Sequence, residues 1–138
     1  MARYLADKSA LARMPNAIVS ARLRPLIEAG EIATCGIVAL EVLWSARSPQ
    51  DLRDTRQELQ RSLSWVPTTE ADFQRALDVM QMLTDAGRHR DAKLPDVVLA
   101  AVAERAGLTV LHYDHDFDAI ASVTGQPMEW IVPSGSVP

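Results

Sequence analysis

Short apolar runs and longer helical patterns alternate along this chain. The apolar runs predict strands near residues 4–6, 31–34, 65–67, 109–111 and 128–132. Between them, apolar residues recur with helical spacing near residues 8–13, 16–29, 36–44, 49–63, 69–86, 96–106 and 118–123. Strands separated by helices imply parallel βαβ units with right-handed crossovers. The pattern therefore predicts an α/β fold with helices on both faces of a parallel sheet.

The ends of several predicted helices carry residues that usually begin or end a helix. Thr69 and Asp72 have the spacing of a capping box, and Pro95 lies at the start of its helix. Gly30 and Gly125 follow the last apolar residues of their helices, a position where glycine is common. These residues mark where the predicted helices begin and end.

Length and composition are those of an ordinary globular domain. The chain has 138 residues, of which 48% are hydrophobic and 23% charged. We assign residues 1–133 to one domain and residues 134–138, rich in Pro and Ser, to a short C-terminal tail. Cys35 is the single cysteine, and no apolar run predicts a signal peptide or a membrane span. We expect a cytoplasmic location.

The formal net charge is −4, which argues against a broad basic surface that holds nucleic acid by counterion release. Most of the cations are nevertheless arginines, whose planar guanidinium groups bind phosphate in a bidentate geometry. Local contacts with phosphate remain compatible with the sequence.

Five acidic residues occupy positions that surface charges rarely take. Asp7, Asp114 and Asp116 directly follow predicted strands, whereas Glu41 and Asp96 interrupt strongly apolar segments. In open parallel sheets, ligands gather beyond the carboxyl ends of the strands, where these side chains would meet. The sequence therefore predicts one shared acidic pocket.

An acidic pocket of this kind favours a divalent cation. Carboxylates gathered without a cation would repel one another and raise one another's pKa values. Mg²⁺ and Mn²⁺ prefer carboxylate and water oxygens and are often completed by a substrate phosphate. Such an ion can generate a hydroxide nucleophile and neutralise charge on the phosphate. Metal-dependent hydrolysis of phosphodiester bonds is the predicted chemistry.

The acids also have structural interpretations. Asp7 and Asp96 lie at helix starts, where a carboxylate caps the helix or complements its dipole. Glu41 is harder to explain in this way, since an acid between Leu40 and Val42 needs a partner or a solvent-filled cleft. A functional interpretation is therefore strongest for Glu41.

Other metal sites fit the sequence less well. Residues 114–118 resemble the start of a calcium loop, but Ala119 stands at the required glycine and Gly125 at the required glutamate. His112 and His115 lack a close third histidine or cysteine for zinc. Calcium and zinc are not expected.

Four features occur in a specific order along nearly the whole chain. They are YLADKSAL at residues 4–11, a helical Glu41, LPDVVLAA at residues 94–101 and DHDF at residues 114–117. Together they resemble the PIN-domain ribonucleases, and specifically the VapC toxins of bacterial toxin–antitoxin pairs. Each feature is weakly specific alone, and their order is the specific part.

The resemblance implies a PIN-like three-layer α/β/α sandwich with a central parallel sheet, acting as a Mg²⁺- or Mn²⁺-dependent endoribonuclease. The catalytic acids that it implies are Asp7, Glu41, Asp96 and Asp114. The metal ligands expected from it are Asp7, Asp96, Asp114 and Asp116, with Ser9 as a residue that supports Asp7. Lys8 and His112 depart from the family pattern, which usually has Thr or Ser at both positions. Both departures predict altered hydrogen bonding around the acids.

The same resemblance implies partners. We expect an RNA substrate, often transfer or ribosomal RNA in this family, and a cognate VapB-type antitoxin that neutralises the toxin. A homodimer is expected, which would form a heterotetramer or larger assembly with the antitoxin. No membrane partner is expected.

Two alternatives remain open from the sequence. Asp114 and Asp116 after a strand could form the nucleophile and acid of an aspartyl-phosphate phosphatase, although Phe117 and Asp118 replace that class's usual glycine and threonine. Alternatively, the chain could be a non-catalytic binding module with a groove near Trp44. Linkage between Mn²⁺ and thermal stability would separate a metal site from such a module.

Overall fold

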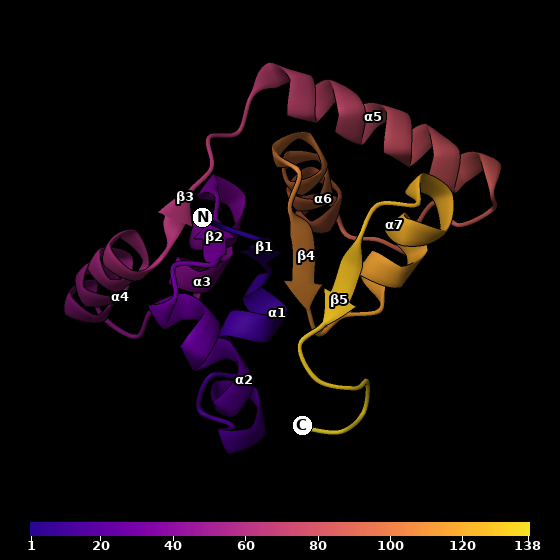
Figure 1. Ribbon diagram of the computed structural model, residues 1–138. Helices are drawn as coiled ribbons and strands as arrows, with labels where there is room; N and C mark the ends of the chain where they lie inside the picture. Colours follow the sequence, from indigo (N-terminus) through magenta and orange to yellow (C-terminus); the bar gives the residue numbers. More distant parts are fainter.

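Five strands form a single parallel sheet in this computed structural model, which describes residues 1–138 (Figure 1). Their order across the sheet is β3-β2-β1-β4-β5. The strands are β1 (Tyr4–Ala6), β2 (Ile32–Thr34), β3 (Ser64–Trp65), β4 (Thr109–His112) and β5 (Met128–Trp130). The predicted α/β class with a parallel sheet is confirmed.

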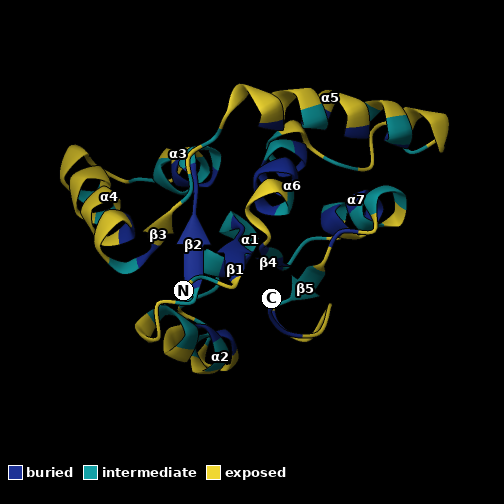
Figure 2. Cartoon of the chain, turned by 45° about the horizontal axis from the view of Figure 1, so that its top comes forward, coloured by how far each residue is buried: buried dark blue, intermediate teal, exposed yellow.

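Seven helices flank this sheet. They are α1 (Lys8–Leu11), α2 (Ala17–Glu28), α3 (Gly36–Trp44), α4 (Pro49–Ser62), α5 (Glu70–Asp85), α6 (Leu94–Ala106) and α7 (Asp116–Thr124). Buried residues of α5, α6 and α7 form one apolar cluster, and buried residues of α1, α2 and α4 form another. The sheet therefore separates two helical layers, and α6 is the helix with the most buried residues (Figure 2).

The strand residues alternate between these two clusters. Leu5 of β1 belongs to the cluster of α5, α6 and α7, whereas Tyr4 and Ala6 belong to the other cluster. All three residues are buried, because successive side chains of a strand point to opposite faces and both faces are covered. Continuous apolar strands are the sequence signature of this arrangement.

Several predicted elements begin or end at other residues in the structure, and two of these shifts have a clear cause. Strand β3 ends at Trp65. Val66 still donates to the Thr34 carbonyl (2.8 Å), but Pro67 has no N–H to continue the ladder. Helix α7 begins at Asp116, two residues before the predicted start, because its amide donates to Asp114 Oδ1 (2.9 Å) in a turn that leads into the helix.

The short C-terminal tail folds back onto the domain. The Tyr113 hydroxyl donates to the Val137 carbonyl (2.7 Å) and accepts from the Val137 amide (3.2 Å). Arg13 Nε donates to the Pro138 carbonyl (3.1 Å), and Val137 is buried. The last residues are thus held beside the segment that follows β4.

Helix α3 is less buried than its apolar sequence indicates. Val38 and Ala39 face the core, but Leu40 is 68% exposed and Trp44 is 89% exposed. The exposed Trp65 of β3 lies on the rim of the same apolar groove as Leu40. These side chains leave an uncovered apolar surface on this part of the molecule.

None of the helices combines the length and apolar character that a membrane crossing requires.

Candidate metal centre

Two of the predicted acids are brought together by neighbouring strands. Asp7 follows β1 and Asp114 follows β4, and these strands pair in parallel at the centre of the sheet. The Asp7 amide donates to the Leu111 carbonyl of β4 (2.9 Å), which fixes the two strand ends side by side. The carboxyl edge of the sheet therefore places both acids in one region, as the topology predicts.

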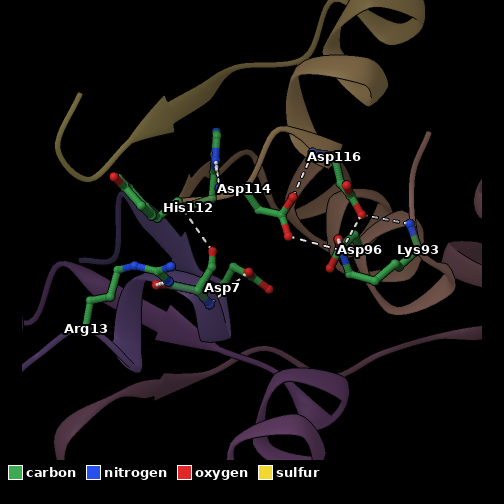
Figure 3. Close-up of polar contacts among 9 residues, drawn as sticks. Asp7, Arg13, Lys93, Asp96, His112, Asp114 and Asp116 are labelled. Carbon is green, nitrogen blue, oxygen red and sulfur yellow. Dashed lines mark hydrogen bonds and ion pairs between the residues drawn. The ribbon is translucent and has the colours of Figure 1, made fainter. Parts of the chain in front are cut away.

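Helices supply the other acids. Asp96 lies in the first turn of α6, Glu41 lies in α3, and Asp116 begins α7. One carboxylate oxygen from each of Asp7, Glu41 and Asp96 lies within 4.8 Å of the others, and the same holds for Asp96, Asp114 and Asp116. Asp96 belongs to both sets, so the structure brings all five predicted acids into one cluster. Figure 3 shows four of them, Asp7, Asp96, Asp114 and Asp116.

Asp7 caps a helix with one carboxylate oxygen and leaves the other without a hydrogen bond. Its Oδ2 caps α1 by accepting from the Ser9 amide (3.0 Å). Its Oδ1 is buried and has no hydrogen-bond partner, and the residue is 4% exposed. A cap needs only one of the two oxygens, so the cap interpretation does not account for the second.

Asp96 is the most deeply buried acid of the cluster. It is 2% exposed, and its buried Oδ2 has no hydrogen-bond partner. Burial, followed by the negative charge of Asp7, raises the pKa of Asp96 to about 8. A carboxylate at a helix start gains from the helix dipole, but this gain does not satisfy a buried oxygen among other acids.

Glu41 faces the same cluster from α3 and is partly exposed. Burial and the charge of Asp7 raise its pKa, while Lys8 and Lys93 lower it by a smaller amount. The proximity of Glu41 to Asp7 and Asp96 explains why an acid occurs in this apolar helix. The side chain points to the cluster instead of pairing with a basic residue.

The donor set fits a hard divalent cation. The cluster offers carboxylate oxygens only, and two of them, Asp7 Oδ1 and Asp96 Oδ2, are buried without partners. Mg²⁺ and Mn²⁺ bind such oxygens and retain several waters, so two carboxylates suffice to hold one ion. The groups of side chains close enough to hold an ion contain no histidine, and Asp118 of the apparent calcium loop is not among them.

Comparison with known proteins decides the family. The PIN domain pattern matches residues 5–123 of the chain. The chain belongs to the PIN-domain family. It is 46% identical over 134 residues to a protein named Ribonuclease VapC21 from Mycobacterium tuberculosis (strain CDC 1551 / Oshkosh), and the match covers 97% of each chain.

Further matches agree with this family. Ribonuclease VapC51 from Mycobacterium tuberculosis (strain ATCC 25618 / H37Rv) is 41% identical over 135 residues, covering 98% of this chain and 97% of the relative. A chain in the crystal structure of DNA-bound VapBC from Salmonella typhimurium has a TM-score of 0.76 at 16% identity, covering 96% of this chain and 100% of that chain. The predicted resemblance to VapC ribonucleases is confirmed, and the phosphatase alternative is superseded.

Ser9 lies between two parts of this PIN domain. Its amide donates to Asp7, and its hydroxyl accepts from the Tyr113 amide (2.8 Å). Arg13 Nη1 donates to the Ser9 carbonyl (2.7 Å). Ser9 thereby links the residue after β1 to the segment that carries Asp114.

His112, which stands where the family pattern usually has Thr or Ser, accepts a hydrogen bond next to the cluster. Its Nδ1 accepts from the Asp114 amide (3.2 Å), and its ring lies 4.9 Å from the rings of Phe117 and Trp130, centre to centre. Burial lowers the pKa of His112, in keeping with a neutral ring that can accept at Nδ1. The residue is fully buried and shapes the turn that presents Asp114.

Lys93 is the site residue that the sequence interpretation missed. Its Nζ lies 2.6 Å from Asp116 Oδ2, 3.1 Å from Asp114 Oδ2 and 3.7 Å from Asp96 Oδ2. Although burial opposes the charge of Asp116, hydrogen bonds from Lys93 outweigh that effect and lower the pKa of Asp116. The available signal was the position of Lys93, three residues before Asp96 and directly before the LPD segment.

Proposed function

We propose that this VapC-type PIN domain is the toxin of a type II toxin–antitoxin pair and hydrolyses phosphodiester bonds of RNA with Mg²⁺ or Mn²⁺. The supporting observation is the pair of buried oxygens without a hydrogen bond, Asp7 Oδ1 and Asp96 Oδ2, within a cluster of five acids. Leaving such groups unsatisfied costs folding free energy, which a bound cation would offset. The names of the relatives support RNA as the substrate.

The residues expected to hold the ion are Asp7 and Asp96. Asp114 and Asp116 lie on the other side of the cluster. When bound, Mg²⁺ or Mn²⁺ supplies Lewis acidity toward a phosphate oxygen and the attacking water. Asp7 is held in place by the Ser9 amide, and Asp96 by the rigid first turn of α6. Both carboxylates are thereby oriented before the substrate arrives.

Glu41 is the proposed proton acceptor. Its carboxylate is partly exposed beside Asp7 and Asp96, so a water at the substrate phosphate can reach it. The raised pKa of Glu41 makes the carboxylate a better base than an ordinary surface glutamate. The proton of the attacking water would move to a Glu41 carboxylate oxygen as the new phosphorus–oxygen bond forms and the bond to the leaving ribose oxygen breaks. The leaving oxygen takes its proton from solvent.

The RNA class follows from access to the cluster. The acids lie at one edge of a compact domain, so a segment that enters must expose its backbone to this edge. Single-stranded loops of structured RNA meet this requirement better than A-form helices, and transfer and ribosomal RNA contain such loops. We propose one of these two as the target.

A VapB-type antitoxin is the proposed partner. The solved relative from Salmonella typhimurium is described as a VapBC complex, which supports an antitoxin for this chain. A groove of about 540 Å³ lies between α1, α2, α3 and α4 and is half lined by hydrophobic residues, including Leu11, Ile27 and Val42. Lys8, close to the acids, also lines this groove. A bound antitoxin segment could thus cover apolar surface and reach the site entrance. A homodimer of the toxin completes the proposed assembly.

The proposal is tested by incubating purified, antitoxin-free protein with total cellular RNA in Mg²⁺, Mn²⁺ or EDTA. Discrete fragments are expected with either ion and not with EDTA. Asp7→Asn should abolish them, whereas Asp118→Asn is the control, because Asp118 belongs to the acidic segment of Asp114 and Asp116 but not to the cluster. Fragments with Asp7→Asn at the original rate would contradict the proposed site.

Thermal unfolding separates an inactive assay from an absent metal site. Mn²⁺ should raise the melting temperature of the original protein by mass action and leave that of Asp7→Asn nearly unchanged. A folded protein that cleaves no RNA and shows no stabilisation by Mn²⁺ would favour the non-catalytic binding module instead.

A further inference from the structure

The two halves of the acidic cluster differ in what accompanies the carboxylates. The half made of Asp7, Glu41 and Asp96 contains the partnerless Asp7 Oδ1, and no basic side chain forms an ion pair with Asp7 or Glu41. The half made of Asp96, Asp114 and Asp116 contains the ammonium group of Lys93. Figure 3 shows Lys93 beside Asp96 and Asp116, with Asp7 across the cluster.

Lys93 makes the contacts that a cation in this half would make. Its ammonium group has three N–H donors, and it lies 2.6 Å from Asp116 Oδ2 and 3.1 Å from Asp114 Oδ2. The third acid, Asp96, lies 3.7 Å away through Oδ2, within ion-pair distance but beyond a hydrogen bond. One positive charge is thus shared among all three carboxylates of this half.

A divalent ion in this half would have to displace the ammonium group or lie close to it. The carboxylate oxygens are within 4.8 Å of one another, so an ion bound to them would be separated from Lys93 Nζ by only a few bond lengths. Repulsion between like charges at such a distance is strong in a partly buried site. In the first half, Lys93 lies within ion-pair distance only of the shared acid Asp96 (3.7 Å), and it pairs with neither Asp7 nor Glu41.

We infer that Lys93 takes the place of a second divalent cation, so that this protein binds a single ion, on the side of Asp7 and Asp96. This inference rests on the proposed metal-dependent function and makes it more specific. Asp114 and Asp116 then hold Lys93, and through it they balance the charge of the cluster, instead of binding an ion of their own.

The sequence offers a matched control for this inference. Lys8 and Lys93 are the only lysines of the chain. Lys8 is close enough to the cluster to influence Glu41, but it forms no ion pair with any of the five acids. Removing the charge of Lys8 therefore changes the local field and leaves the three-carboxylate half occupied by Lys93.

The carboxylates should keep their arrangement when the Lys93 side chain is changed. The Lys93 backbone amide donates to Asp116 Oδ2 (3.0 Å), and the Asp116 amide donates to Asp114 Oδ1 (2.9 Å). Neither bond needs the ammonium group. The Lys93 side chain is also 62% exposed, so its replacement leaves no buried cavity.

The test is the number of Mn²⁺ ions bound per chain, measured by titrating the full-length protein and following free Mn²⁺ by electron paramagnetic resonance. We expect one ion for the original protein, two for Lys93→Met, and one for both Lys93→Arg and Lys8→Met. Two ions in the original protein, or one in a folded Lys93→Met, would overturn the inference.

Asp116→Asn provides a second measurement that does not depend on the folding of Lys93→Met. If Lys93 replaces the second ion, Asp116→Asn still binds one ion with the original affinity. A loss of one bound ion in Asp116→Asn would overturn the inference. If the original protein binds no Mn²⁺ at all, the proposed metal site itself fails, and this outcome is distinct from a count of two.

Discussion

Two buried aspartates of this protein have nearly the same exposure and opposite surroundings. Asp72 is 1% exposed and Asp96 is 2% exposed. Asp72 accepts from Arg105 Nε through Oδ1 (2.7 Å) and from the Thr69 amide through Oδ2 (2.8 Å). Asp96 has a buried oxygen without a partner and lies among four other acids. Burial alone therefore does not distinguish a structural acid from a functional one.

The pKa values of the two acids move in opposite directions. Burial raises the pKa of Asp72, but hydrogen bonds from Arg105 and Thr69 outweigh it and hold the pKa below its usual value. Burial and Asp7 together raise the pKa of Asp96 to about 8. Both acids are tied to α6, since Asp96 lies in its first turn and Arg105 in its last. One helix thus connects a satisfied acid to an unsatisfied one.

The largest expected effect separates the two acids by activity. Asp96→Asn should lower the initial rate of RNA cleavage in Mg²⁺ at least about 100-fold, because it removes a charged ligand whose supporting contacts alone are worth 10- to 100-fold in metal sites. Asp72→Asn should retain the original rate per folded molecule. Equal losses in the two variants would end the distinction between them.

The second-largest expected effect is a difference in the pH dependence of stability between Asp96→Asn and the original protein. In EDTA, the raised pKa of Asp96 means that the folded state favours the protonated carboxyl. The stability that protonated Asp96 contributes to folding is fully present below the unfolded pKa near 4 and is lost as pH rises toward about 8. Asp96→Asn has no carboxyl that must lose a proton, so it does not lose this stability. Between pH 5 and 8 its free energy of unfolding should therefore rise relative to that of the original protein, by at most about 1.4 kcal/mol per pH unit.

Urea denaturation at several pH values in this range measures that gap. Asp72→Asn serves as the control, because the lowered pKa of Asp72 gives a contribution that is fully present above the unfolded pKa near 4 and is lost only at lower pH, so its difference from the original protein should stay constant between pH 5 and 8. A free energy of unfolding of Asp96→Asn that falls relative to that of the original protein as pH rises would contradict the unsatisfied state of Asp96.

A smaller loss is expected from Asp72→Asn at neutral pH. The change removes the charge that Arg105 pairs with and one acceptor of the α5 capping box, and such charge-assisted bonds contribute about 1–3 kcal/mol. The free energy of unfolding should fall by that amount in urea denaturation. An unchanged value would mean that the Asp72–Arg105 pair makes no net contribution to stability.

The smallest effect sharpens the structural side of the comparison. Thr69→Ala removes a cap hydroxyl but keeps the ion pair of Asp72 with Arg105, so it should cost about 1 kcal/mol. RNA cleavage per folded molecule should stay at the original rate. A cleavage defect in Thr69→Ala would show that the capping region of α5 influences the acid cluster.

Much of the fold was readable in the chain because its signals are local. Continuous apolar strands, the Thr69–Asp72 capping box and the glycines after helices depend on residues close in sequence. The exposure of Leu40 and Trp44 was not readable, because an apolar helix predicts burial and only the placement of α3 leaves these side chains uncovered. Exposed apolar side chains such as these therefore cannot be predicted from periodicity.

The acid cluster was predicted from strand ends, whereas the cation within it was not. Asp7 and Asp114 follow neighbouring parallel strands, which forces them to one edge of the sheet. Lys93 belongs to a polar loop, where a lysine normally lies in solvent, and nothing local indicates that its ammonium group meets Asp114 and Asp116. Its contacts span more than 20 residues of sequence.

The sequence by itself determined the family, the parallel α/β architecture and the identity of the five acids, because periodicity and motif order are properties of the chain. Only the tertiary structure decided which acids are satisfied. Asp72 meets Arg105, Asp96 meets other carboxylates, and Lys93 meets Asp116. These pairings depend on how α5, α6 and the loop before α6 pack together, and the packing is set by the whole core.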